Sequence, residues 1–142
     1  MAIFIGLFLA IAVSLSATYA GFGRERVFYP IILIVVASYY ELFAAIGESP
    51  AALAMETLVF VAFVAAAYYG FKGNLTIVVV GLAAHGIFDL VHSGVITNPG
   101  VPDWWPLFCS SYDLAAAIYL YVLLKRGAIL STKVRPAQVY NV

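Results

Sequence analysis

The sequence predicts an all-α membrane protein, a bundle of five transmembrane helices with its N-terminus outside and its C-terminus in the cytoplasm. Of the 142 residues, 65% are hydrophobic and only 10% are charged, and the mean hydropathy is +1.03. Soluble domains carry about 25% charged residues and are roughly half apolar. Several stretches of roughly 18 residues or more contain few charges, which is the length needed to cross a hydrocarbon core. We therefore expect lipid, and not water, to surround most of the chain.

The first span is expected at residues 3–22 and the second at 30–47. Glycines and the charged run Arg24-Glu25-Arg26 end the first span, and Pro30 opens the second. A cleaved signal peptide is the alternative for the first span, because its Ala-rich end falls near Ala20. Its basic residues follow the apolar stretch instead of preceding it, which favours a retained helix.

The other three spans are expected at 51–70, 75–96 and 105–125. A tight reversal over Gly47 to Pro50 precedes the third span, where Ser49 suits the N-cap and the proline suits the first helical turn. The segment from Gly70 to Asn74 separates the third span from the fourth. The segment from Asn98 to Asp103 contains two prolines and a glycine, which is typical of a rigid turn.

The basic residues give the orientation, because all seven fall on one side of this map. They are Arg24, Arg26, Lys72, Lys125, Arg126, Lys133 and Arg135. The positive-inside rule makes that side cytoplasmic, so residues 127–142 form a short basic cytoplasmic tail. Trp104 and Trp105 then lie at the outer interface, which indoles favour. We expect a bacterial cytoplasmic (inner) membrane, and no basic face remains for nucleic acid.

Ionisable residues inside the spans gather at one depth. Four acids and both histidines lie within the predicted helices: Glu41, Glu56, Asp89, Asp113, His85 and His92. With a rise of about 1.5 Å per residue, the first three acids lie roughly 9 Å below the outer boundary and Asp113 slightly deeper. His92 is shallower and His85 is nearer the middle. These residues therefore predict a polar site in the outer half of the membrane.

The cost of burying these groups indicates that something neutralises them. Each ionised side chain at mid-bilayer costs about 2.5–3.5 kcal/mol, so four carboxylates approach 10 kcal/mol. No Lys or Arg lies inside a predicted span, which leaves protons, histidine cations or a bound metal ion. The alternative is a packing role, since a single His or acid in a span often only hydrogen-bonds a neighbour. That alternative fits His92 and Cys109 when each is taken alone.

We expect a divalent metal site formed by His85, Asp89 and His92 with Glu41, Glu56 or Asp113. The first three are spaced i, i+4, i+7 and share one helix face. The ligand count matches dinuclear carboxylate sites of helix bundles, which carry acid-x-x-His pairs on two helices. Here both histidines share one helix, so a mononuclear site is equally consistent. Oxygen and imidazole ligands suit Zn, Fe or Mn.

Cysteine and small residues add two further observations. Cys109 is the only cysteine, which excludes an internal disulfide and a thiol-based metal cluster. Cys109 and Asp113 share one face of the fifth span. Ala62, Ala66 and Gly70 form a small-residue seam that lets helices approach closely, either within one chain or in a homodimer.

Two motifs carry a resemblance to a known family. The segment 85–92 reads His-Gly-Ile-Phe-Asp-Leu-Val-His, and 105–113 reads Trp-Pro-Leu-Phe-Cys, then Asp after three residues. The chain resembles a family of small, uncharacterised bacterial membrane proteins with the pattern His-x3-Asp-x2-His and Trp-Pro-x-Phe-Cys-x3-Asp. The resemblance singles out His85, Asp89, His92, Cys109 and Asp113 but implies no activity. The chain is similar, by analogy only, to sterol isomerase-type proteins, which use buried acids and histidines for proton transfer.

The sequence supports three function hypotheses. The first is a metalloprotein, a membrane hydrolase or oxidoreductase acting on a lipid or other apolar substrate from the outer leaflet. Glu41, Glu56 or Asp113 would then serve as the catalytic acid or base. The second is a metal-free protein that transfers protons in the manner of an isomerase, or that binds a lipid or an amine. The third is a small ion-coupled transporter, which the apolar inner halves of the spans disfavour.

Overall fold

The computed structural model describes residues 1–130, where the secondary structure consists of helices and no strands. Its elements are α1 (Ala2–Ala20), η1 (Phe22–Arg24), α2 (Phe28–Ile46), α3 (Pro50–Lys72), α4 (Thr76–Val95) and α5 (Trp105–Lys125). Each of the five α-helices is long and apolar enough to cross a membrane. The predicted all-α bundle of five transmembrane helices is therefore confirmed. The helices also begin and end within two residues of the predicted spans.

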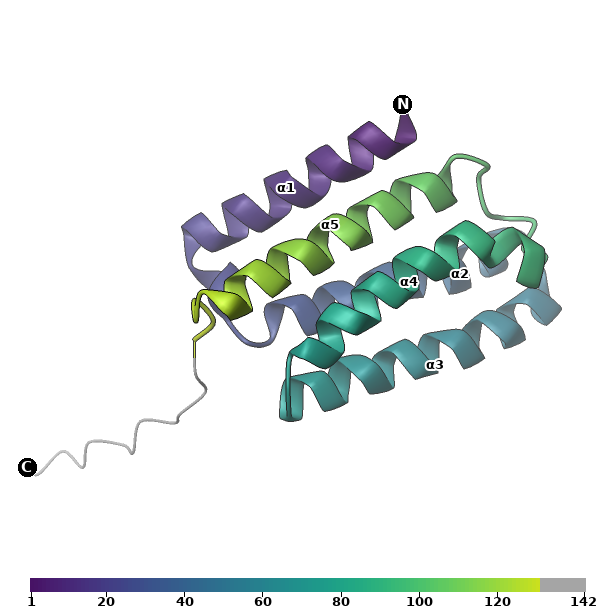
Figure 1. The fold of residues 1–142 in the computed structure, drawn as a ribbon. Helices are drawn as coiled ribbons and strands as arrows, with labels where there is room; N and C mark the ends of the chain where they lie inside the picture. Colours follow the sequence, from purple (N-terminus) through teal and green to yellow (C-terminus); the bar gives the residue numbers. More distant parts are fainter. Residues whose placement is uncertain (131–142) are drawn as a thin grey trace, which may run out of the picture.

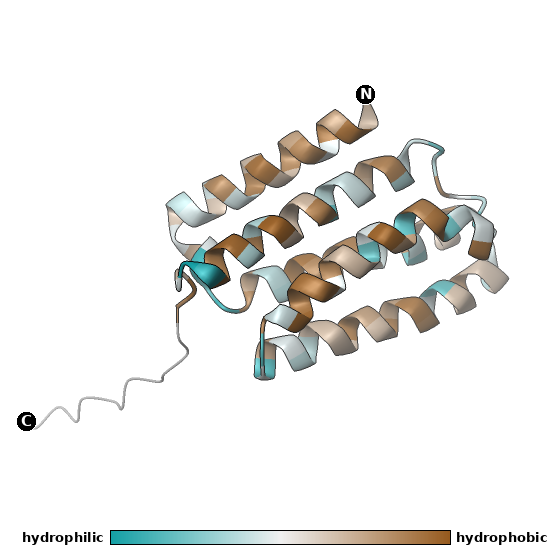
Figure 2. Cartoon of the chain, viewed as in Figure 1, coloured by the Kyte–Doolittle hydropathy of each residue, from teal (hydrophilic) through white to brown (hydrophobic). Residues whose placement is uncertain are grey.

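The helices run along one another in a bundle with α4 and α2 at its centre (Figure 1). Helix α4 packs against both α3 and α5, α2 packs against α3 and α4, and α1 packs along α5. Apolar residues occur along every helix (Figure 2), and many of the large ones are exposed. Such a surface suits lipid, because the hydrophobic effect would penalise it in water.

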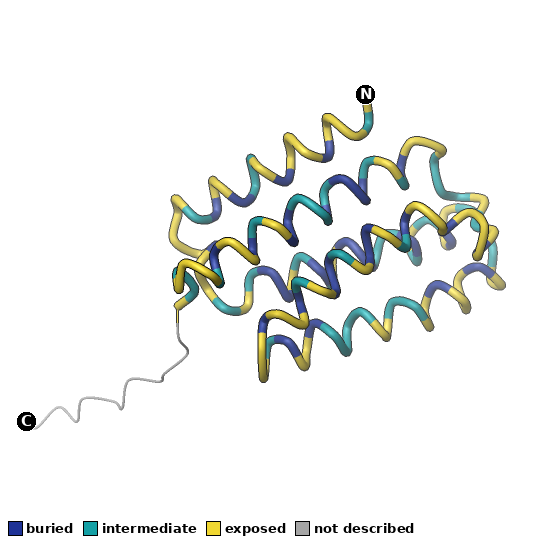
Figure 3. The backbone as a smooth tube through the Cα atoms, in the orientation of Figure 1, coloured by how far each residue is buried: buried dark blue, intermediate teal, exposed yellow. Residues whose placement is uncertain are grey.

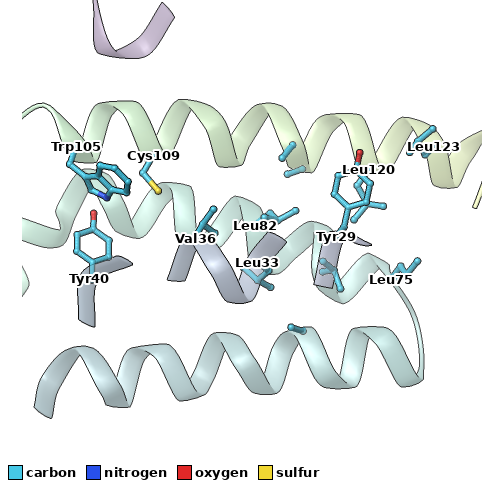
Figure 4. Packing of buried hydrophobic residues seen from close by; sticks show 14 residues of the cluster. Tyr29, Leu33, Val36, Tyr40, Leu75, Leu82, Trp105, Cys109, Leu120 and Leu123 are labelled. Carbon is cyan, nitrogen blue, oxygen red and sulfur yellow. The ribbon is translucent and has the colours of Figure 1, made fainter. Parts of the chain in front are cut away.

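The apolar core lies between α2, α4 and α5. Leu33, Leu82 and Leu120 are fully buried there, and Tyr29 packs at the same end of the bundle (Figure 4). Tyr40, Trp105 and Cys109 lie at the other end of this cluster. The core is thus apolar toward one end and polar toward the other, as the predicted depths of the ionisable residues require.

Helix α1 lies at one edge of the bundle, against α5 (Figure 1). Its buried positions are all small residues, Gly6, Ala10, Ser14 and Ala17, which form one stripe along the helix facing α5 (Figure 3). Small residues permit close backbone contact between membrane helices. A Cβ atom at Gly6 would lie 2.3 Å from the carbonyl oxygen of Phe108, so no larger residue fits there.

The turns agree with their local sequence in most respects. Ser49 caps α3 by accepting a hydrogen bond from the backbone N–H of Ala52, and Pro50 begins the helix. Glycine usually takes the left-handed conformation in a turn. In this reversal Glu48 takes it, with φ of 51°, and the adjacent Gly47 does not. Gly47 is needed for another reason, because a Cβ there would lie 2.6 Å from the backbone nitrogen of Gly100.

The described basic residues lie at one end of the bundle, with η1, the α3–α4 turn and the end of α5 (Figure 1). The guanidinium of Arg26 donates hydrogen bonds to the carbonyl oxygens of Phe71, Gly70 and Gly73 at the end of α3. Carbonyls at a helix C-terminus have no partner within the helix, so this contact ties the first loop to α3. The N-out, C-in orientation stays a prediction. Most of the predicted tail, 127–142, lies outside the described residues.

Candidate metal centre

Helices α4 and α5 together position four chemically reactive side chains. His85 and Asp89 are four residues apart on α4, and Cys109 and Asp113 are four residues apart on α5. Residues at this spacing lie one above the other on a helix face. Gly86 lets the helices approach, since a Cβ atom there would lie 3.1 Å from the Ser110 carbonyl oxygen and 3.3 Å from Asp113 Cβ.

The four side chains form a compact buried group. One ligand atom from each of His85, Asp89, Cys109 and Asp113 lies within 4.8 Å of every other, and all four residues are buried. His85 Nδ1 is 2.6 Å from Asp113 Oδ2 and 3.7 Å from Asp89 Oδ2. The Cys109 thiol lies 3.8 Å from Asp113 Oδ2. This group could hold a metal ion.

Two carboxylate oxygens in the group lack a hydrogen bond within the described residues. Asp89 Oδ2 and Asp113 Oδ1 are buried and make no hydrogen bond within the described part of the chain. Buried polar atoms are nearly always hydrogen-bonded, and an orphaned one indicates strain, function or a missing ligand. Within residues 1–130, the ion pairs of the buried carboxylates are all with histidines. The group therefore has an unmet requirement for a cation or a proton.

Aromatic side chains surround the group and orient it. The Tyr40 hydroxyl donates a hydrogen bond of 2.7 Å to Asp89 Oδ1, which fixes that carboxylate. The Phe63 ring meets the His85 imidazole edge to face, with ring centroids 4.8 Å apart. A hydrogen-bonded outer layer of this kind usually sets the orientation of metal ligands.

A second polar pair lies beside this group, toward the α4–α5 loop. His92 Nε2 is 2.7 Å from Glu56 Oε1, and the Asn98 amide donates to the same oxygen at 2.9 Å. The Tyr40 ring stacks on the His92 imidazole at 3.9 Å between centroids. Tyr40 therefore contacts both polar groups, one through its hydroxyl and the other through its ring.

The α4–α5 loop holds Asn98 in place over this pair. The Asn98 amide also donates to the Tyr40 carbonyl oxygen. Gly100 sits directly on α2, where any Cβ atom would overlap the Phe43 carbonyl oxygen. The predicted rigid turn thus closes the end of the bundle over Glu56 and His92.

The structure divides the predicted ligands into three places. His85, Asp89 and Asp113 come together, while His92 and Glu56 form the separate pair. Glu41 lies near the surface, where its carboxylate accepts a hydrogen bond from the Thr57 hydroxyl at 2.8 Å. The fourth member of the compact group, Cys109, was not among the predicted ligands, although its i, i+4 spacing from Asp113 was the available signal.

The two tryptophans also differ from one another. Trp104 is exposed, as an interfacial residue would be, but Trp105 is buried and packs between Tyr39, Phe43 and Phe108. Its indole N–H has no hydrogen-bond partner among the described residues.

No protein-family model, curated protein or solved structure matches this chain. The resemblance of the His-x3-Asp-x2-His and Trp-Pro-x-Phe-Cys-x3-Asp motifs to a family stays a prediction. The function must therefore be inferred from the geometry of the site.

Proposed function

We propose that this protein is a membrane-embedded metalloprotein in which His85, Asp89, Cys109 and Asp113 bind one divalent metal ion. The observation that carries the proposal is a pair of buried carboxylate oxygens that lack a hydrogen bond among the described residues, Asp89 Oδ2 and Asp113 Oδ1, next to an imidazole and a thiol. A metal ion would take up these oxygens and the other two ligands at once.

Electrostatics favour a cation at this position. Two carboxylates share one buried group with a single histidine, and burying an uncompensated charge costs several kcal/mol (of order 3–5 when a partner is missing). Protonated His85 neutralises at most one of them. A divalent ion neutralises both without requiring either acid to be protonated, and a bound cation dominates the local charge balance.

The donor set points to the class of metal. Imidazole nitrogen, carboxylate oxygen and one thiolate are the ligands that Zn²⁺ accepts in proteins, usually with tetrahedral geometry. Adding Cys109 to the predicted nitrogen and oxygen ligands makes Mn a weaker candidate, because Mn prefers oxygen donors. Zn is therefore the first choice and Fe the second.

Such a centre suits an enzyme that acts on a lipid or other apolar substrate. An ion held by these four residues would supply a bound water whose pKa is lowered to near 7. A carboxylate oxygen of Asp89 or Asp113 that does not contact the ion would then serve as the general base. With the predicted orientation, the site lies in the outer half of the membrane. This arrangement supports a metal-dependent hydrolase before an oxidoreductase.

A metal-free proton-transfer protein is the second candidate. The contact of 2.6 Å between His85 Nδ1 and Asp113 Oδ2 favours it, because this pair forms a hydrogen bond without any metal. Tyr40 and Cys109 extend the polar chain on either side. A transporter is disfavoured, since fully buried Leu33, Leu82 and Leu120 fill the core toward the basic end of the bundle.

Elemental analysis of protein purified in mild detergent without added metal tests the proposal. We expect close to one Zn or Fe per chain, lost in His85→Ala and in Asp89→Ala. Glu56→Gln and His92→Gln are matched controls, because they change buried polar residues outside the compact group and should retain the metal. Unchanged metal content in His85→Ala and Asp89→Ala, or no metal in the parent protein even after reloading, would overturn the metal site.

A further inference from the structure

An apolar groove runs between α1, α2 and α5 and reaches the candidate metal centre. Helix α1 packs along α5 and leaves a gap to α2, and the gap encloses a volume of about 300 Å³. Its walls are apolar or aromatic: Leu9, Val13, Ile32, Val36, Phe108 and Tyr112. Leu9 is exposed on the surface that the bundle presents to lipid, so the groove opens toward the membrane.

Cys109 forms the floor of this groove and links it to the compact group. Cys109 is 2% exposed and lines the groove, and its thiol lies 3.8 Å from Asp113 Oδ2. Of the four proposed ligands, Cys109 is the one that lines the groove. A molecule in the groove would therefore reach the centre from the side of the membrane.

One residue that lines the groove carries a buried hydrogen-bond donor without a partner among the described residues. Trp105 lines the groove one helical turn before Cys109, is 9% exposed, and has its indole N–H unpartnered within residues 1–130. Figure 4 shows Trp105 and Cys109 projecting from the same face of α5. Such a buried donor costs free energy until an acceptor reaches it. A ligand with an oxygen atom at this position would supply that acceptor.

The lining restricts the chemistry of the ligand. Within residues 1–130 no charged side chain lines the groove, so a free carboxylate or a phosphate would lack a counter-charge from this part of the chain. The volume lies at the lower limit of about 300–1,000 Å³ for small-molecule sites, which suits one chain instead of two. A neutral molecule with one hydrocarbon chain and an uncharged acceptor oxygen satisfies both conditions.

We propose that this groove binds a single-chain neutral lipid, with the chain along α1 and α2 and its carbonyl or ester oxygen at the Trp105 indole N–H. The lipid head then lies beside Cys109, next to the compact group. This assignment rests on the proposed function for its role as a substrate, although binding to the groove does not depend on a metal. It names the class of substrate and its direction of approach.

Quenching of Trp105 fluorescence tests the binding. The chain has two tryptophans, so Trp104→Phe leaves Trp105 as the only one. The probe is a dibrominated stearic acid methyl ester, titrated into protein in detergent. We expect saturable quenching, and roughly three- to tenfold weaker binding of a dibrominated alkane of equal length, which lacks the acceptor oxygen.

Two variants that fill the groove provide the structural check. Val13→Phe and Val35→Phe each add volume to the lining of the groove. Each should raise the half-saturating concentration of the probe by roughly tenfold. Ile11→Phe is the matched control, because Ile11 is an exposed residue of α1 that does not line the groove. Quenching that rises linearly without saturation would overturn the groove as a binding site. So would equal quenching in Trp104→Phe and in the three variants made in that background.

Metal content, measured on the same samples, separates the two proposals. Saturable quenching in protein that binds no metal would support the groove and contradict the metal centre. One metal per chain with only linear quenching would support the metal centre and contradict the lipid site. Retention of metal in Val13→Phe together with weaker quenching is the result expected if both proposals hold.

Discussion

Tyr40 is the residue that connects the two polar groups of the bundle. Its hydroxyl donates to Asp89, its ring lies on the His92 imidazole, and its carbonyl oxygen accepts from Asn98. The side chain is 2% exposed, so lipid and water do not compete for these contacts. Loss of the hydroxyl alone should therefore affect Asp89 without removing the aromatic packing.

Tyr40→Phe provides the test at this scale. The variant keeps the ring on His92 but leaves Asp89 Oδ1 without its donor, next to an Asp89 Oδ2 that already lacks one. Loss of an outer hydrogen bond to a metal ligand typically weakens metal affinity by about 10–100-fold. Competition with a chelator of known affinity measures the change.

Tyr39→Phe is the matched control for this measurement. Tyr39 is the neighbouring tyrosine and packs on Trp105 and Phe43, away from Asp89. Its substitution should leave the metal affinity within about twofold, since no interaction with the compact group is removed. Equal effects of the two variants would contradict the role assigned to the Tyr40 hydroxyl.

At the scale of elements, α1 is attached to the bundle by a stripe of small residues. Its contacts run mainly to α5, and Tyr119 adds a hydrogen bond to the Thr18 hydroxyl at 3.2 Å. The large side chains of α1, such as Phe4 and Phe8, are exposed. Because lipid tails are as apolar as leucine, close backbone packing is what holds such a helix.

Gly6→Ala should therefore loosen α1. The added Cβ would lie 2.2 Å from Ser111 Oγ and 2.3 Å from the Phe108 carbonyl oxygen, and the latter belongs to the backbone of α5. Overpacking of this kind costs about 1–3 kcal/mol. Thermal unfolding in detergent should show a lower midpoint than the parent protein. Ile11→Ala, at a lipid-facing position of the same helix, should change the midpoint little, and a midpoint unchanged in Gly6→Ala would contradict the close contact.

At the scale of the whole molecule, the sequence predicts where the helices lie in the chain well, but it predicts poorly which side chains of different helices contact one another. Span length and apolar composition are properties of each segment alone, and each predicted span is a helix. The depths of the four acids and two histidines also follow from the span ends, which is why all six were grouped in advance and the three that meet could not be singled out. Depth gives no direction around the helix axis, however, and that direction decides which side chains meet.

Tyr40 and Glu41 illustrate what the sequence leaves open. They are adjacent on α2, yet Tyr40 is buried against the compact group and Glu41 faces Thr57 near the surface. In a soluble helix the polar face would point outward, but a membrane helix presents apolar residues to both lipid and core. Likewise His85 and His92 share a face of α4 and still take partners from α5 and α3, respectively. Only the tertiary packing separates them.

The orientation of the molecule is the last prediction. Positive charge lies at the end of the bundle that contains η1 and the α3–α4 turn, whereas the α4–α5 loop carries Asp103 and no Lys or Arg. The positive-inside rule places the first end in the cytoplasm, and with it places the compact group in the outer half of the membrane. The direction from which a lipid reaches the groove follows from the same assignment.

Cysteine labelling of bacterial spheroplasts measures the orientation directly. Asp103 and Lys72 are exposed at opposite ends, so Asp103→Cys should react with a membrane-impermeant maleimide and Lys72→Cys should react only after permeabilisation. The unsubstituted protein is the control, because Cys109 is buried and should stay unlabelled in both conditions. The reverse pattern would contradict the N-out, C-in orientation and move the groove and the compact group to the cytoplasmic half. The lipid would then be one drawn from the inner leaflet, while the metal ligands and the Trp105 contact would be unaffected.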